Sequence, residues 1–124
     1  MSLEAIRDWI SRIPKAELNM PSIPYQGRVY TPKQILEMAE AGTLPEELQE
    51  KIERGAFTTA EEVYQIGLQR VKKYLEQLPP SLTLYVGTQP YTVKELLEEV
   101  EKGSPIGRAF VESEIRKWET LYRR

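Results

Sequence analysis

The chain has 124 residues, of which 40% are hydrophobic and 29% are charged, and this composition is typical of a folded globular protein of one domain. Seventeen basic and nineteen acidic side chains leave a formal net charge of −2, which argues against general attraction to nucleic acid or anionic membranes. The chain contains neither cysteine nor histidine, so disulfides, thiolate metal sites and histidine-based catalysis are excluded.

The sequence also predicts where in the cell the protein is located. No apolar run approaches the ~18 residues that a membrane-spanning helix needs. The first ten residues, MSLEAIRDWI, carry acidic side chains where a signal peptide has a basic start and an apolar stretch. We therefore expect a cytoplasmic protein without a membrane partner.

The first predicted element is an amphipathic helix that ends before Pro14. Its apolar side chains recur at helical spacing and define one buried face: Leu3, Ile6, Trp9, Ile10 and Ile13. Residues 14–22, PKAELNMPS, follow as the one stretch with the composition of a linker.

A fourteen-residue segment that begins in the first third of the chain has a similar copy near the end of the chain. YTPKQILEMAEAGT, residues 30–43, and YTVKELLEEVEKGS, residues 91–104, share seven identical residues of fourteen. This identity exceeds what two unrelated amphipathic helices usually share, so we predict an internal repeat.

Each copy of this segment predicts a helix of about ten residues, with capping residues at both of its ends. A threonine caps the start, and a Gln or Glu three residues later completes a capping box; these pairs are Thr31 with Gln34 and Thr92 with Glu95. Gly42 and Gly103 supply the left-handed residue that ends a helix.

A short hairpin is predicted before each of these helices. In IPYQGRVYT and LYVGTQPYT a Gln-Gly or Gly-Thr pair separates two β-prone runs, and glycine adopts the positive φ of a tight turn without penalty. Pro90 lacks an N–H, so its strand should lie at an edge.

The remaining segments are predicted helices. TLPEELQEKIERG (43–55) and SPIGRAFVESEIRKWETLYRR (104–124) follow the two capped helices, and TTAEEVYQIGLQRVKKYLEQLPP (58–80) predicts a central helix ~30 Å long. The predicted fold is α+β and helix-dominated, with two hairpin-helix-helix units that share one interior across the central helix. We assign residues 1–124 to a single domain: N-terminal helix and linker 1–21, first unit 22–55, central helix 56–80, and second unit 81–124 with a long C-terminal helix.

Catalysis would have to rest on carboxylates, since histidine and cysteine are absent. The paired glutamates, however, lie near predicted helix starts or on polar faces, where they favour the helix dipole and solubility: Glu46/Glu47, Glu61/Glu62 and Glu98/Glu99. No metal-ligand or phosphate-loop pattern is found. We predict a protein that is not an enzyme, with no cofactor, metal or small-molecule ligand, and keep a carboxylate enzyme as a minor alternative.

Aromatic side chains provide the candidate interaction surface. Four tyrosines occupy the two hairpins and two further aromatic residues lie on the final helix: Tyr25, Tyr30, Tyr85, Tyr91, Trp118 and Tyr122. Packing inside the chain is the alternative for each. The stripe 111, 115, 118, 122 fits either the central helix or the same helix of a second copy. We predict a non-catalytic protein–protein interaction or adaptor module that forms a homodimer.

Nucleic-acid binding is the alternative function. The C-terminal helix carries five basic and three acidic residues, and its candidate contacts are Arg116, Lys117, Arg123 and Arg124. The helix predicted at 43–55 could be the second helix of a helix-turn-helix motif. It is acidic, however, so it would repel phosphates. We therefore regard nucleic acid as a possible but less favoured partner.

Overall fold

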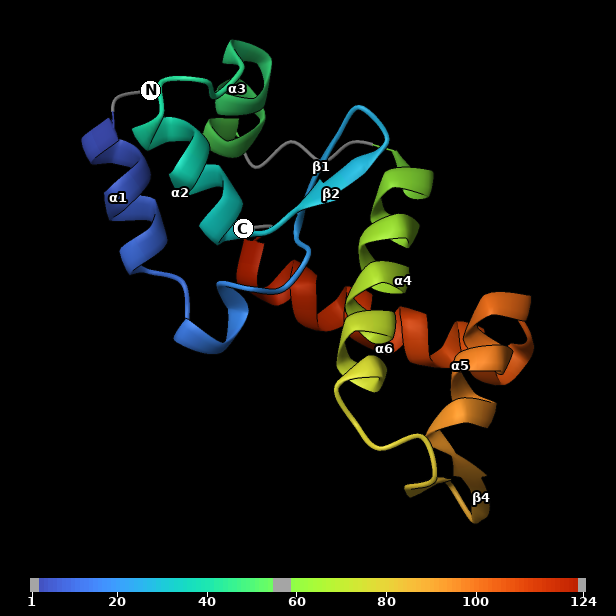
Figure 1. Ribbon diagram of the computed structural model, residues 1–124. Coiled ribbons are helices and arrows are strands. Elements are labelled where there is room, and N and C mark those ends of the chain that lie inside the picture. Colours follow the sequence, from blue (N-terminus) through green and yellow to red (C-terminus); the bar gives the residue numbers. More distant parts are fainter. Residues whose placement is uncertain (1–2, 55–58, 123–124) are drawn as a thin grey trace.

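The computed structural model describes residues 3–54 and 59–122, and within them the fold is helix-dominated α+β, as predicted (Figure 1). The first half contains α1 (Leu3–Ser11), a 3-10 turn (Lys15–Glu17), β1 (Ile23–Tyr25), β2 (Arg28–Tyr30), α2 (Pro32–Glu40) and α3 (Glu46–Arg54). The second half contains α4 (Ala60–Glu76), β3 (Thr83–Val86), β4 (Gln89–Thr92), α5 (Val93–Lys102) and α6 (Pro105–Tyr122). None of the helices in these two described ranges is long and apolar enough to cross a membrane.

The four strands form two separate antiparallel hairpins. In the first, Tyr25 pairs with Arg28 across a two-residue turn in which both Gln26 (φ 47°) and Gly27 (φ 77°) have positive φ. Two consecutive positive values are the signature of a type I′ turn, whose twist matches that of the strands. In the second hairpin Val86 pairs with Gln89 around Gly87 (φ 64°), so both predicted turns are confirmed.

The helices that follow the hairpins begin with the predicted capping boxes. Thr31 Oγ1 accepts from the Gln34 N–H at 3.1 Å, and Gln34 Oε1 accepts from the Thr31 N–H at 2.8 Å. Thr92 and Glu95 repeat this exchange at 3.1 and 2.9 Å. Two backbone donors of each first turn are satisfied in this way.

The two helices also end alike. Gly42 (φ 72°) and Gly103 (φ 68°) are left-handed, and the following N–H of Thr43 or Ser104 bonds back to the carbonyl of Met38 or Glu99. Such bonds satisfy carbonyls that the helix end leaves free. The two segments therefore share one local conformation, while their origin by duplication stays a prediction.

The buried side chains form two clusters. The first joins α1, the first hairpin, α2 and α3 with single residues of α4 and α6: Ile6, Ile23, Ile35, Leu48, Ile52, Ile66 and Trp118. The second joins α4, α5 and α6 beneath the second hairpin: Val71, Leu75, Val93, Leu96, Val100 and Val111. The interior that we expected the units to share is thus divided in two, with each hairpin-helix unit packed at its own end (Figure 1).

Both long helices, α4 and α6, run through both clusters and cross at Gly67 (Figure 1). A Cβ atom at position 67 would lie 2.5 Å from Ile115 Cγ1 and 2.9 Å from the Val111 carbonyl oxygen. The helix axes can approach this closely only because residue 67 has no side chain.

We predict that Gly67→Ala destabilises the protein by about 1–2 kcal/mol, because overpacking at the crossing outweighs the roughly 1 kcal/mol by which alanine favours a helix. Urea unfolding will measure the change, with the exposed Lys73→Ala on the same helix as control. In an Ile115→Ala background the penalty should shrink, since one clashing atom is removed. A more stable Gly67→Ala protein would show that the crossing has room for a methyl group.

We predict that the α5 cap responds to pH and the α2 cap does not. Hydrogen bonds from the Thr92 backbone and side chain lower the pKa of Glu95, whereas Gln34 holds the same position in α2 without a charge. A lowered pKa means that the carboxylate stabilises the fold at neutral pH, and that this contribution disappears as the pH falls through the usual glutamate range to the lowered value.

The stability difference between the wild type and Glu95→Gln, measured by urea unfolding from neutral to acidic pH, should therefore shrink on acidification. Gln34→Glu is the matched variant and should introduce the same dependence in α2. Identical pH profiles for wild type and Glu95→Gln would refute the role of the charge.

Candidate functional site

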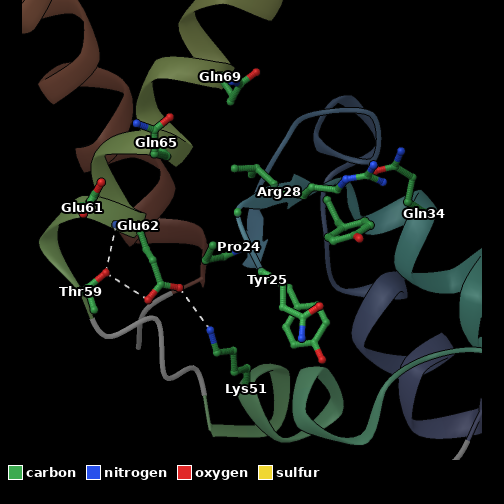
Figure 2. A pocket seen from close by; sticks show the side chains of 14 residues that line it. Pro24, Tyr25, Arg28, Gln34, Lys51, Thr59, Glu61, Glu62, Gln65 and Gln69 are labelled. Atoms are coloured by element: carbon green, nitrogen blue, oxygen red, sulfur yellow. Dashed lines mark hydrogen bonds and ion pairs between the residues drawn. The ribbon is translucent and has the colours of Figure 1, made fainter.

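A groove of about 820 Å³ lies between the first hairpin and the N-terminal half of α4 (Figure 2). The hairpin forms one wall, with Tyr25, Arg28 and Tyr30. The other wall comes from α4, and Gln34 of α2 and Lys51 of α3 complete the lining. Residues of the first hairpin, α2, α3 and α4 therefore meet here.

The hairpin wall is held in place by contacts to the first cluster and to α3. Tyr25 and Tyr30 pack partly against the first cluster, and the Tyr25 hydroxyl donates a hydrogen bond of 3.4 Å to Glu47 Oε2. Desolvation, and then the negative charge of Glu47, raise the pKa of Tyr25, so its hydroxyl stays protonated at neutral pH. Arg28, at the start of β2, is exposed and makes no ion pair with any described residue.

The helical wall begins at the cap of α4. Thr59 Oγ1 accepts from the Glu62 N–H at 3.1 Å. Glu62 Oε1 lies 3.0 Å from the Thr59 hydroxyl and Glu62 Oε2 lies 3.2 Å from Lys51 Nζ, so both carboxylate oxygens are engaged (Figure 2). Glu61, Gln65 and Gln69 follow at four-residue spacing and therefore share one face of α4, along the groove.

The groove offers hydrogen-bond donors and acceptors rather than a reactive centre. Its polar lining consists of amides, phenols, the Thr59 hydroxyl, the Glu61 carboxylate, the Arg28 guanidinium and the Lys51–Glu62 pair. Over residues 3–54 and 59–122, no group of three His, Cys, Asp or Glu side chains is arranged to hold a metal ion.

A second polar cluster lies inside the molecule and centres on Arg70 of α4, whose side chain has no exposed surface. Its guanidinium binds both oxygens of Glu17, at 2.7 and 3.0 Å, and also Glu114 Oε1 at 3.1 Å and Ser22 Oγ at 3.0 Å. Burial lowers the pKa of Arg70, but the hydrogen bond to Glu17 and the charges of both carboxylates raise it by more. The net result is a pKa above the usual arginine value. The cation is therefore fixed, and because it is sealed from solvent we assign it a structural role.

One of the predicted surface aromatics, Trp118, belongs to this interior, so its assignment to an interaction surface is wrong, whereas Tyr122 beside it is only partly buried. Trp118 is fully buried and its Nε1–H donates to the Ser22 carbonyl at 2.8 Å. Tyr122 stacks on Trp118 with ring centroids 6.1 Å apart. The Tyr122 hydroxyl is buried beside Ser22 without hydrogen-bond geometry to any described residue, and burial raises its pKa. Both rings fill the space between α6 and the first cluster.

The other predicted residues are distributed over the molecule. Tyr25 and Tyr30 meet in the groove, Tyr91 packs against the second cluster, and Tyr85 is exposed on the second hairpin. Arg116 and Lys117 are exposed on α6, where Lys117 lies 3.8 Å from Glu114. Arg123 and Arg124, the other candidate nucleic-acid contacts, lie outside the described residues.

Comparison with protein-family models found no matching family, and comparisons with curated proteins and with solved structures found no match.

Sequence reasoning missed most of the groove and all of the Arg70 cluster. Arg70 falls four residues after Ile66, within the apolar stripe of α4, and a charge at that position was a usable signal for a buried ion pair. Its partners Glu17 and Ser22 lie in the segment that we predicted to be a linker, where composition gives no sign of burial.

We predict that Arg70→Met destabilises the protein by about 3 kcal/mol, because it leaves the carboxylate of Glu17 without its counter-charge in a largely buried site and leaves Glu114 with only Lys117 at 3.8 Å. Lys72→Met is the matched control on the same helix: Lys72 lies 3.8 Å from Glu101 in an exposed pair, and its loss should cost less than about 1 kcal/mol. Arg70→Lys should fall between them, since an ammonium cannot bind a carboxylate through two donors at once. Equal losses for the two methionine variants in denaturant unfolding would contradict the assigned role.

Proposed function

We propose that this protein is a non-catalytic protein-binding module, and that the groove between the first hairpin and α4 holds an extended segment of a partner protein. The observation that carries this proposal is the pairing of two unlike walls in one open groove. The hairpin presents tyrosine rings, and α4 presents a row of side chains that can hydrogen-bond a peptide backbone.

The charges of the groove add direction to the proposed contact. Arg28 on the hairpin and Glu61 on the helix are both exposed, and neither makes an ion pair with another described residue. They lie on opposite walls (Figure 2). A segment with an acidic side chain toward Arg28 and a basic side chain toward Glu61 would complement both, and such complementarity selects partners and orientation more than it adds affinity.

The cysteine-free composition is compatible with a reducing compartment, and we propose the cytoplasm as the place of this role. An adaptor of this kind needs no reactive group, in agreement with the engaged carboxylate of Glu62. The binding energy would come from a few buried contacts with the tyrosine rings, while the amides set the register.

We predict that a displayed library of random peptides will yield binders whose affinity depends on the groove. For the enriched peptides, the double variant Arg28→Glu/Gln65→Ala should weaken binding roughly tenfold or more, through lost charge complementarity and a lost amide contact. Isothermal titration calorimetry is the measurement. Both residues are exposed, so unchanged urea unfolding will show that the fold is intact.

Lys73→Glu is the matched control, because it alters the charge of α4 at an exposed residue that does not line the groove. It should leave peptide affinity unchanged. Failure to enrich any peptide, or equal binding by the wild type and the groove variant, would overturn the proposed site.

A further inference from the structure

The second hairpin lies at the far end of the molecule from α1 to α3, and its sequence carries no charge (Figure 1). Residues 77–93, between Glu76 and Lys94, include no charged side chain, although 29% of the whole chain is charged. Exposed strand edges are usually protected by lysine or other charges, because an unprotected edge pairs with other strands. This hairpin lacks that protection apart from one proline.

One face of this hairpin is open to solvent. Leu84 and Val86 point inward and pack against the second cluster, whereas Tyr85 is 71% exposed and the nearby Leu82 is 41% exposed. The first hairpin differs, because its Pro24 is buried and both of its strands contact α4. An exposed tyrosine on an uncharged strand is the kind of surface that proteins use for association.

The position of Pro90 identifies which edge is available. Pro90 pairs with Tyr85 but has no N–H, so the two are expected to form a non-hydrogen-bonded pair. The N–H and C=O of Tyr85 then point away from β4, and by the two-residue alternation so do those of Thr83. The hydrogen bond of 2.9 Å from the Val93 N–H to the Leu82 carbonyl fits this phase. The edge of β3 therefore keeps its donors and acceptors, whereas the edge of β4 lacks the Pro90 donor.

We propose that β3 pairs with β3 of a second copy of this chain, antiparallel and across a two-fold axis, to give a four-stranded sheet. With the axis at Leu84, Thr83 of each copy forms a hydrogen-bonded pair with Tyr85 of the other. This register uses all outward N–H and C=O groups of the two residues, and every other register centred on a residue of β3 that does so needs a residue outside the strand, Ser81 or Gly87. Tyr85 would then lie directly across from the Thr83 side chain of the other copy.

A second copy fits this edge for an electrostatic reason. Two identical surfaces that meet across a two-fold axis bring equal net charges together, so an uncharged surface can associate without like-charge repulsion. Threonine, tyrosine and valine, three of the four residues of β3, also favour strands. The inference extends the proposed protein-binding role to a second surface and does not depend on the groove.

Two variants that differ only at residue 83 test the register. Thr83→Lys/Tyr85→Lys places lysine across from lysine in both pairs, whereas Thr83→Glu/Tyr85→Lys places glutamate across from lysine in both. We expect a wild-type dimer by sedimentation equilibrium, a roughly tenfold or greater weakening in the Lys/Lys variant, and substantial recovery in the Glu/Lys variant. Unchanged urea unfolding of the diluted proteins will show that all three fold alike.

Three results would overturn the proposal. One is a wild type that stays monomeric over about a hundredfold range of concentration up to its solubility limit. If such a monomer binds strand peptides from other proteins at this edge, the partner is a foreign strand and not a second copy. Another is a dimer that both variants leave unchanged, which would place the contact elsewhere. The third is equal weakening by both variants, which would exclude the Thr83–Tyr85 register. The groove variant Arg28→Glu/Gln65→Ala should leave the dimer intact, so failure of the proposed function and failure of this inference are distinguishable.

Discussion

Arg70 is a fully buried cation that must be neutralised, and the residues that neutralise it join the parts of the chain. Glu17 comes from the segment after α1, Ser22 from the entry to the first hairpin and Glu114 from α6. A buried ion pair contributes little net stability compared with apolar packing, but an unpaired buried charge is very unfavourable. The cluster therefore penalises any arrangement in which these segments are apart. Trp118 strengthens the same junction through its bond to the Ser22 carbonyl.

The close crossing of α4 and α6 at Gly67 gives the two hairpins different surroundings. Both helices pass through both clusters, so the first hairpin is packed against α4 while the second remains at the end of the molecule. Similar local units thus present different surfaces: a groove with polar and aromatic lining at the first, and an open strand edge at the second. Two separate contacts of this kind suit an adaptor, in which one surface can serve a partner protein and the other a second copy.

Only part of the candidate site can be predicted from residue patterns in the sequence. The four-residue spacing of Glu61, Gln65 and Gln69 predicts that they share one helix face. The hairpin pattern predicts Tyr25 and Tyr30 as contact residues. Their meeting in one groove depends on the angle between the hairpin and α4, which tertiary packing sets. The aromatic stripe of α6 was ambiguous for the same reason: its spacing predicts an apolar face but does not specify the neighbour that covers it. Trp118 is covered by the chain itself, and Tyr122 is partly covered.

The sequence by itself determined the helices, their caps and the two hairpin turns, because these depend on residues within about four positions of one another. It also excluded thiolate and histidine chemistry, since both side chains are absent. Only the tertiary structure decided that the interior divides into two clusters, that Glu17 and Ser22 meet Arg70, and which hairpin stays open. The second depends on contacts between residues 48 or more positions apart. The direction in which the packed helices cross settles all three.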